Sequence, residues 1–235
     1  MAVYKFKPLQ SNIRADALFT RPILAWEHVS SRFFVMVRDA LGGKTNPSVA
    51  EFSVEPANVL AEIRARYRLF GGAASIFIQA DRLVFDFPNL VPADYPIVSD
   101  VIAAIHDAFP KAFPELKYER VETQSLAHLD LVEIEAIERF LGQYEIALTE
   151  NAFPVPVVML PGLKFTVVAL DQSWQCALLA ERSLLSATAL FVALNMSIRN
   201  LDNAPSYSDK VTLIRTVTSS VMRLVGLESA HAAST

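Results

Sequence analysis

The stretch Ser75-Ile-Phe-Ile-Gln-Ala-Asp-Arg-Leu-Val-Phe-Asp-Phe87 decides the fold of this chain, because it is typical of a β-hairpin. Two runs rich in β-branched and aromatic residues, 75–80 and 83–87, flank the pair Asp81-Arg82. Pro88 and Pro92 follow the second run, and proline is rare within a central strand. The sequence therefore predicts two adjacent antiparallel strands that belong to a larger sheet.

An amphipathic helix follows this hairpin. Between residues 96 and 109 the apolar side chains recur at helical spacing, and polar side chains occupy the other side until Pro110. The apolar set comprises Ile97, Val98, Val101, Ile102, Ile105, Ala108 and Phe109. Residues 116–131 then have the character of a strand. This order predicts an α+β fold in which one helix face packs on a sheet.

The first forty residues contain weaker signals. Residues 17–26 are apolar but are interrupted by Pro22, which favours an edge strand. Residues 29–41 have helical spacing and are followed by Gly42-Gly43, a pair that favours a short helix ended by a left-handed glycine. A strand remains an alternative here, because residues 33–37 are also β-rich.

Residues 59–69 show the clearest alternation in the chain. The odd positions from Val59 are apolar, whereas Arg64, Arg66 and Arg68 share the opposite face. Such a cationic stripe is suited to phosphates or an acidic partner, because the guanidinium group donates two parallel hydrogen bonds. The alternative, which we favour, is a solvated sheet face whose arginines pair with glutamates on neighbouring strands.

The second half of the chain has a similar order of elements. Residues 163–170 and 174–180 predict another hairpin, 188–198 a third strand, and 208–225 a helix that ends at Gly226. The proline-containing segment 150–156 is the best candidate boundary. We expect two pseudo-repeated units of antiparallel strands, each covered by one long helix, over 1–150 and 151–235. The alternative is one continuous domain.

Composition restricts the function classes. Hydrophobic residues form 52% of the chain, yet no apolar run reaches the roughly 18 residues of a membrane span, so the excess is core or interface. The net charge of −4 disfavours nucleic acid as a partner. The single cysteine, Cys176, excludes an intrachain disulfide and lies in an apolar context. Residues 1–8 lack the pattern of a secretory signal, so we expect a cytoplasmic protein without a membrane segment.

Motifs for chemistry are absent. The sequence has no nucleophile elbow, phosphate loop, dinucleotide fingerprint or paired-cysteine motif, and its seven glycines are too few and scattered for a phosphate cradle. We therefore expect no catalytic residue, no metal and no cofactor. His128 and Asp130 share one face of a predicted strand, where a carboxylate can orient an imidazole. A histidine that simply satisfies a hydrogen bond is the alternative that we favour.

Several segments resemble an uncharacterised, sporadically distributed bacterial protein family of about this length. The resemblance rests on Arg66-Tyr-Arg-Leu-Phe-Gly71, Asp81-Arg-Leu-Val-Phe-Asp-Phe87, Tyr95-Pro96, His128-Leu-Asp-Leu131 and a final strand-plus-helix unit. It extends over most of the chain after residue 50. It implies no reaction, cofactor or site residue, because the family has no established activity to transfer.

These patterns favour a non-enzymatic cytoplasmic interaction protein that self-associates or binds a partner protein. The alternative is a protein for a small apolar ligand, or an enzyme of modest chemistry, with a pocket between the sheet and the C-terminal helix. The chain's 15 phenylalanines and other aromatics would line such a pocket or form an ordinary core, and core is favoured. The candidate ligand- or partner-binding residues are Arg64, Arg66, Arg68, His128 and Asp130.

Overall fold

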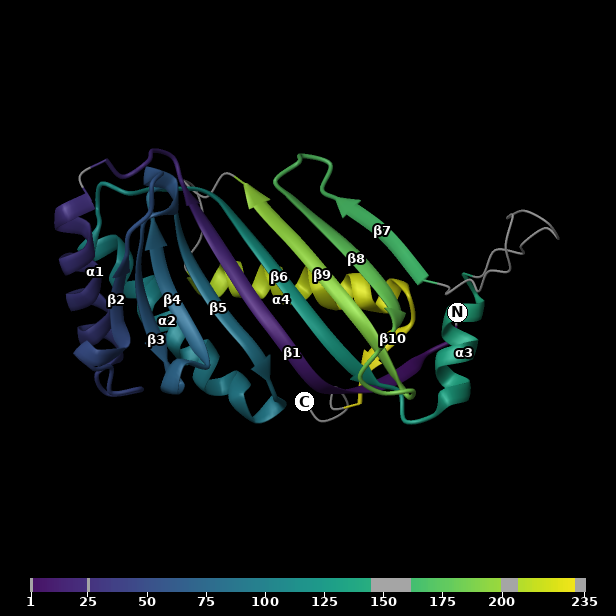
Figure 1. Cartoon of the computed structure of the whole chain (residues 1–235). Helices are drawn as coiled ribbons and strands as arrows, with labels where there is room; N and C mark the ends of the chain where they lie inside the picture. The colour runs from purple at the N-terminus through teal and green to yellow at the C-terminus, as the bar shows by residue number, and fades with distance from the viewer. Residues whose placement is uncertain (1, 25, 145–161, 200–206, 231–235) are drawn as a thin grey trace.

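The computed structural model describes residues 2–24, 26–144, 162–199 and 207–230. Within these ranges the chain is a mixed α+β protein with one large, mainly antiparallel sheet and four α-helices (Figure 1). The predicted hairpin is confirmed as strands β4 (Ala74–Gln79) and β5 (Arg82–Leu90), which pair in antiparallel register. The fold class expected from the sequence is therefore correct at this level.

Strand β1 (Tyr4–Phe19) lies at the centre of the sheet, between β5 and β6 (Tyr118–Asp130). Beyond β5 the sheet continues through β4 and β3 (Arg64–Leu69) to β2 (Phe52–Glu55). Beyond β6 it continues through β9 (Ala189–Arg199) and β8 (Trp174–Arg182) to β7 (Gly162–Val168). The short strand β10 (Leu227–Ser229) pairs in parallel with the start of β1.

The long helices lie on one face of this sheet. In Figure 1, α2 (Tyr95–Ala112) and α4 (Tyr207–Leu224) are seen behind the strands. Helix α1 (Trp26–Leu41) packs on α2 and β3, and α3 (Ile134–Gly142) contacts β8 and β9. No described helix covers the opposite face, which we call the uncovered face. Among the described helices, none combines the length and apolar character that a membrane crossing requires.

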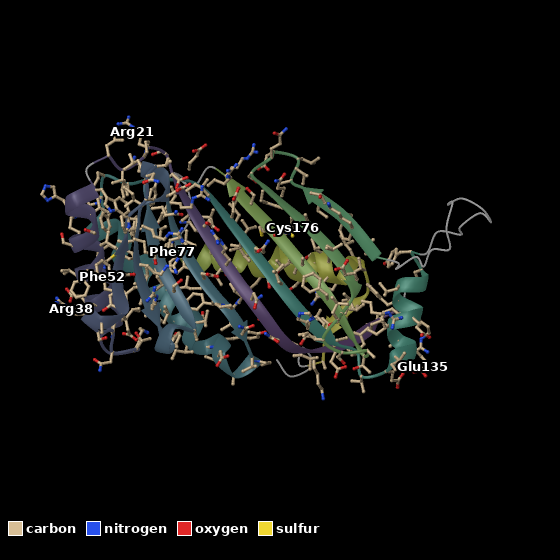
Figure 2. All side chains as sticks on the ribbon, in the orientation of Figure 1. Arg21, Arg38, Phe52, Phe77, Glu135 and Cys176 are labelled. Carbon is tan, nitrogen blue, oxygen red and sulfur yellow. The ribbon has the colours of Figure 1, made fainter. Side chains whose placement is uncertain are left out.

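The helix-covered face holds two separate hydrophobic cores. The first lies under α1 and α2 and includes the fully buried Phe33, Tyr67 and Phe109. The second lies under α3 and α4 and includes Phe140 and Cys176. Figure 2 shows Cys176 on the second half of the sheet, well separated from Phe52 in the first half. The sheet thus carries a core at each side rather than one core at its centre.

Both helices expected in the first half are present. Helix α2 matches the predicted stripe, because its buried side chains are Val98, Val101, Ile105 and Phe109. It continues two residues past Pro110 instead of ending there, since a proline in the last turn removes only one backbone donor. Helix α1 ends before Gly42 as expected, but neither Gly42 nor Gly43 has the predicted left-handed backbone.

The prediction of an edge strand over residues 17–26 is wrong. The strand begins at Tyr4, ends at Phe19 and has neighbours on both sides. Its alternation is hard to recognise because the helix-facing positions include the small Ala15 and Ala17, while Arg14 and Asp16 face the uncovered side. A central strand with one polar face has no long apolar run in its sequence.

The alternating segment before Gly71 is a strand only in its second part. Ala65, Tyr67 and Leu69 of β3 are buried in the first core, and the three arginines lie on the uncovered face. Residues Leu60–Glu62 form a short 3-10 helix instead of the start of this strand. The alternating pattern therefore predicted a strand correctly for the six residues Arg64–Leu69, but not for the residues before them.

One sheet continues through both halves of the chain, because β6 pairs with β9 over eleven residue pairs from Arg120↔Arg199 to Asp130↔Ala189. The candidate boundary at 150–156 falls within residues 145–161, outside the described residues. A pseudo-repeat between the two halves stays a prediction.

We predict that Val132→Gly raises the free energy of unfolding by about 1 kcal/mol, because Val132 is exposed and has φ 72°. A β-branched residue is strained in this left-handed region, whereas glycine is not. Urea unfolding followed by circular dichroism measures the change. Val168→Gly is the control: this exposed valine lies in β7, where glycine should destabilise. Equal destabilisation by both substitutions would contradict the prediction.

Candidate functional site

A cavity of about 430 Å³ lies between the sheet, α2 and α4, in the space between the two cores. Its floor is formed by β1, β6 and β9, and its sides by one face of each helix. The main floor residues are Ile13, Ala15, Ala17, Val121, Thr123, Ser125, Leu194 and Met196. The main helix residues are Tyr95, Val98, Ile102, His106, Lys210, Val211, Ile214 and Thr218. Most of this lining is apolar.

Small side chains on the central strands create the space. Ala15 and Ala17 of β1 pair with Thr123 and Val121 of β6, and Ser125 pairs with Ile13. Elsewhere on the same face, large side chains such as Phe87 and Leu178 are fully buried in the two cores. The small side chains at the centre of the sheet are therefore too short to contact a helix that lies at the usual packing distance.

Helix α4 is anchored at one end and stands over the cavity at the other. Its second half buries Val217 and Val221, and Val225 directly after the helix is also buried in the second core. In its first half, Val211 and Ile214 are only half-buried, although they lie on the sheet side. Because the second half of α4 is fixed in the second core, the first half does not approach the sheet closely enough to fill the cavity.

Two titratable side chains from different helices meet at the cavity wall. His106 Nε2 of α2 lies 3.5 Å from Lys210 Nζ of α4. Burial lowers the pKa of Lys210, and burial followed by the charge of Lys210 lowers the pKa of His106. His106 Nδ1 also lies 3.7 Å from a carboxylate oxygen of Asp107. This pair brings polar, proton-carrying groups to an otherwise apolar chamber.

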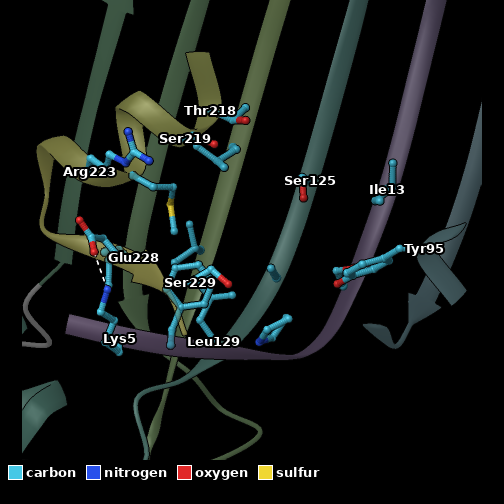
Figure 3. A pocket seen from close by; sticks show the side chains of 18 residues that line it. Lys5, Ile13, Tyr95, Ser125, Leu129, Thr218, Ser219, Arg223, Glu228 and Ser229 are labelled. Carbon is cyan, nitrogen blue, oxygen red and sulfur yellow. Dashed lines mark hydrogen bonds and ion pairs between the residues drawn. The ribbon is translucent and has the colours of Figure 1, made fainter. Parts of the chain in front are cut away.

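A second cavity of about 530 Å³ continues along α4 (Figure 3). It shares five lining residues with the first cavity: Ile13, Tyr95, Ser125, Leu194 and Thr218. At the common wall, the hydroxyl groups of Ser11 and Tyr95 lie 3.1 Å apart. At its far end, Lys5 Nζ contacts Glu228 Oε2 at 2.6 Å and so lowers the pKa of Glu228. The two cavities are neighbours between the sheet and α4, and together we call them the trench.

The predicted arginine stripe lies elsewhere, on the uncovered face. Arg64, Arg66 and Arg68 all lie near Glu55 of β2, with nitrogen–oxygen distances of 3.2, 3.3 and 3.9 Å. The guanidinium groups of Arg64 and Arg66 also stack over Phe77 at 5.5 and 5.1 Å from its ring centre. The structure therefore brings the three arginines together beside one glutamate, as the favoured structural interpretation expected.

His128 and Asp130 lie on the uncovered face but bond to different partners. His128 Nδ1 lies 2.8 Å from Ser183 Oγ. Asp130 Oδ1 accepts hydrogen bonds from Thr188 Oγ1 at 2.8 Å and from the Val132 backbone N–H at 2.9 Å. Asp130 thus holds the turn after β6 and does not orient the imidazole of His128.

The described residues offer little for a metal or a thiolate. In the described part of the chain, no three histidine, cysteine or carboxylate side chains lie close enough to hold a metal ion. Cys176 is fully buried, and this burial raises the pKa of its thiol. As expected from its apolar context, Cys176 is a core residue.

Sequence reasoning placed a possible pocket beside the C-terminal helix but did not identify its lining. Most of the aromatic residues belong to the cores, for example the stacked Phe109 and Phe113, with ring centres 5.0 Å apart. The lining instead depends on small residues two apart on β1 and β6, and on Lys210 and His106. The small-residue alternation in 13–17 and 121–125 was the available signal.

Comparison with known proteins gives no family for this chain. No protein-family model matches it, and no curated protein shows significant similarity to it. The resemblance noted for the sequence stays a prediction, and the function must be inferred from the geometry of the site.

We predict that His106→Gln reduces the acid sensitivity of folding. Because the pKa of His106 is lowered below its unfolded value of 6.5, the unfolded state binds the proton more readily. The stabilising effect is complete above that unfolded pKa and is lost as the pH falls toward the folded pKa. Urea unfolding at about pH 7.5 and about pH 5 should show a smaller loss in the variant. The exposed His28→Gln is the control, and equal losses in the wild type and His106→Gln would refute the prediction.

Proposed function

We propose that this protein binds a small apolar or amphipathic molecule in the cavity between the sheet, α2 and α4. The observation that carries the proposal is the group of small side chains on β1 and β6, at the centre of a sheet whose flanks are tightly packed. These are Ala15, Ala17, Thr123 and Ser125. Ligand sites are typically concave, mainly apolar, and supplied with a few polar groups that orient the ligand. Here the polar groups are the His106–Lys210 pair and the hydroxyl of Tyr95, which lies 3.1 Å from the Ser11 hydroxyl of the neighbouring cavity.

The position of the cavity supports this proposal. It lies where the two hydrophobic cores meet, and such seams are frequent places for ligands. We extend the expected pseudo-repeat to a pair of units with the order strand, helix, meander, helix. The first would extend from β1 to α2 and the second from β6 to α4. In both, the last meander strand pairs with the first strand: β5 with β1 and β9 with β6.

This division differs from the one at residue 150, and it gives the cavity a simple origin. The seam between the units would run between β1 and β6, and the last helix of each unit would stand beside it. Two helices that each pack on their own unit would leave the strip between them uncovered. The ligand would fill that strip.

We predict that Ala15→Phe abolishes binding of a neutral apolar probe, because the ring would occupy the cavity. Titration with N-phenyl-1-naphthylamine, followed by its fluorescence, should show affinity weakened by at least about tenfold. Ala177→Phe is the matched control, since Ala177 lies on β8 among residues of the uncovered face. Circular dichroism checks that both variants fold. Unchanged binding by folded Ala15→Phe would show that the probe does not use this cavity.

Self-association in the cytoplasm is the second candidate function, and one surface favours it. The turn after β6 and the β8–β9 turn lie side by side, because the Leu131 backbone N–H donates to Thr188 O at 2.9 Å. These two turns expose Val132, Ile134, Leu184 and Leu185. An exposed apolar group of this kind often marks a protein–protein contact, and we propose a second copy of this chain as the partner.

We predict that the double variant Leu184→Ser, Leu185→Ser shifts the protein toward monomer, since both leucines are exposed and contribute apolar area. Sedimentation velocity at a series of protein concentrations in the micromolar range measures the distribution between monomer and oligomer. The control replaces Leu24, another exposed leucine on a separate loop, with serine. A wild type that is monomeric throughout, or an oligomer insensitive to the double variant, would reject this surface.

A further inference from the structure

Lys210 is a cation in an unusual setting. It lies at the wall of the apolar cavity and is half-buried. Its Nζ lies 3.5 Å from Nε2 of the His106 imidazole, which is not an anion. In the described part of the chain, no carboxylate forms an ion pair with it. A buried ammonium group without a counter-ion is unfavourable unless an anion is supplied. The site is therefore suited to one negative charge.

The cations at the other end of the trench differ in this respect. Lys5 already forms an ion pair with Glu228, and Arg223 lies near the same carboxylate. Figure 3 shows Lys5, Arg223 and Glu228 gathered at that end, away from Tyr95 and Ile13. A negative ligand group thus gains more at Lys210 than at the Lys5 end, where the Glu228 carboxylate already pairs with Lys5 and lies near Arg223.

The trench between these ends is long and apolar. Lys210 and Arg223 are thirteen residues apart on α4, which corresponds to about 20 Å at the usual helical rise. Ile13, Ser125 and Leu194 of the sheet border both cavities, so the two spaces are neighbours along α4. An extended hydrocarbon chain fits this shape better than a compact ring system.

We propose that the ligand is a linear fatty acid, with its carboxylate at Lys210 and His106 and its chain along α4 toward Arg223. This inference rests on the proposed function and specifies the ligand of that cavity. Arg215 also lines the cavity but is exposed to solvent. Lys210 and the His106 imidazole match a single carboxylate, whereas a phosphate group usually recruits several cationic or backbone donors. The half-buried Val211, Ile214 and Met222 would contact the chain.

The test compares dodecanoate with dodecanol, which have the same chain length but differ in charge. Each displaces N-phenyl-1-naphthylamine from the delipidated full-length protein. The wild type should bind dodecanoate about tenfold more tightly, and Lys210→Met should remove that preference while dodecanol affinity stays within about twofold. Longer carboxylates should bind more tightly, by up to about fourfold for each added methylene. Lys164→Met, on an exposed lysine of β7, is the matched control and should bind like the wild type.

The outcomes separate this inference from the proposed function. If dodecanol and dodecanoate bind equally well, and both are blocked by Ala15→Phe, the cavity binds apolar ligands but the carboxylate assignment is wrong. If Lys210→Met leaves the preference for dodecanoate unchanged, the charge is recognised elsewhere and the inference is also overturned. If Ala15→Phe affects neither compound, the proposed function itself fails.

Discussion

The antiparallel pairing of β1 with β6 is the constraint on which the rest of this structure depends. It extends from Lys7↔Asp130 to Phe19↔Tyr118 and joins residues that are 99 to 123 positions apart in sequence. Each of the two strands then pairs with its own meander, β1 with β5 and β6 with β9. The helices follow these meanders, so each core forms beside the central pair and neither forms on top of it.

The other face of the central pair explains why this sheet needs no second layer of helices. Arg14 bonds to both carboxylate oxygens of Asp16, at 2.8 and 2.9 Å, and this pairing raises the pKa of Arg14. Arg82 lies 3.7 Å from the same carboxylate. Charge pairs and polar side chains satisfy much of this face in contact with water. Its buried apolar residues Phe77 and Val84 lie beside the arginine stripe, whereas both hydrophobic cores form on the helix-covered face.

The sequence predicted the parts of the fold that are encoded locally. The hairpin of β4 and β5, helix α2 and the alternation of β3 each have a periodic pattern within one segment. Strand β1 was missed because its central position depends on pairing with distant strands. Ala15 and Ala17 have small side chains, and their partners on β6 are known only once the register is fixed. A pocket beside the C-terminal helix was one alternative from the sequence, but its lining was missed for the same reason, since it comes from β1, β6, β9, α2 and α4 together. The arginine stripe was found but not its partner Glu55, which lies on a separate strand.

The cavity persists because its walls are held from outside. Helix α2 is fixed by Val101, Ile105 and Phe109 in the first core, and α4 by Val217 and Val221 in the second. Collapse onto Ala15 and Thr123 would require one of these helices to leave its own core, exposing large apolar side chains to water. Small residues on two paired strands, opposite two helices anchored in separate cores, therefore maintain the cavity.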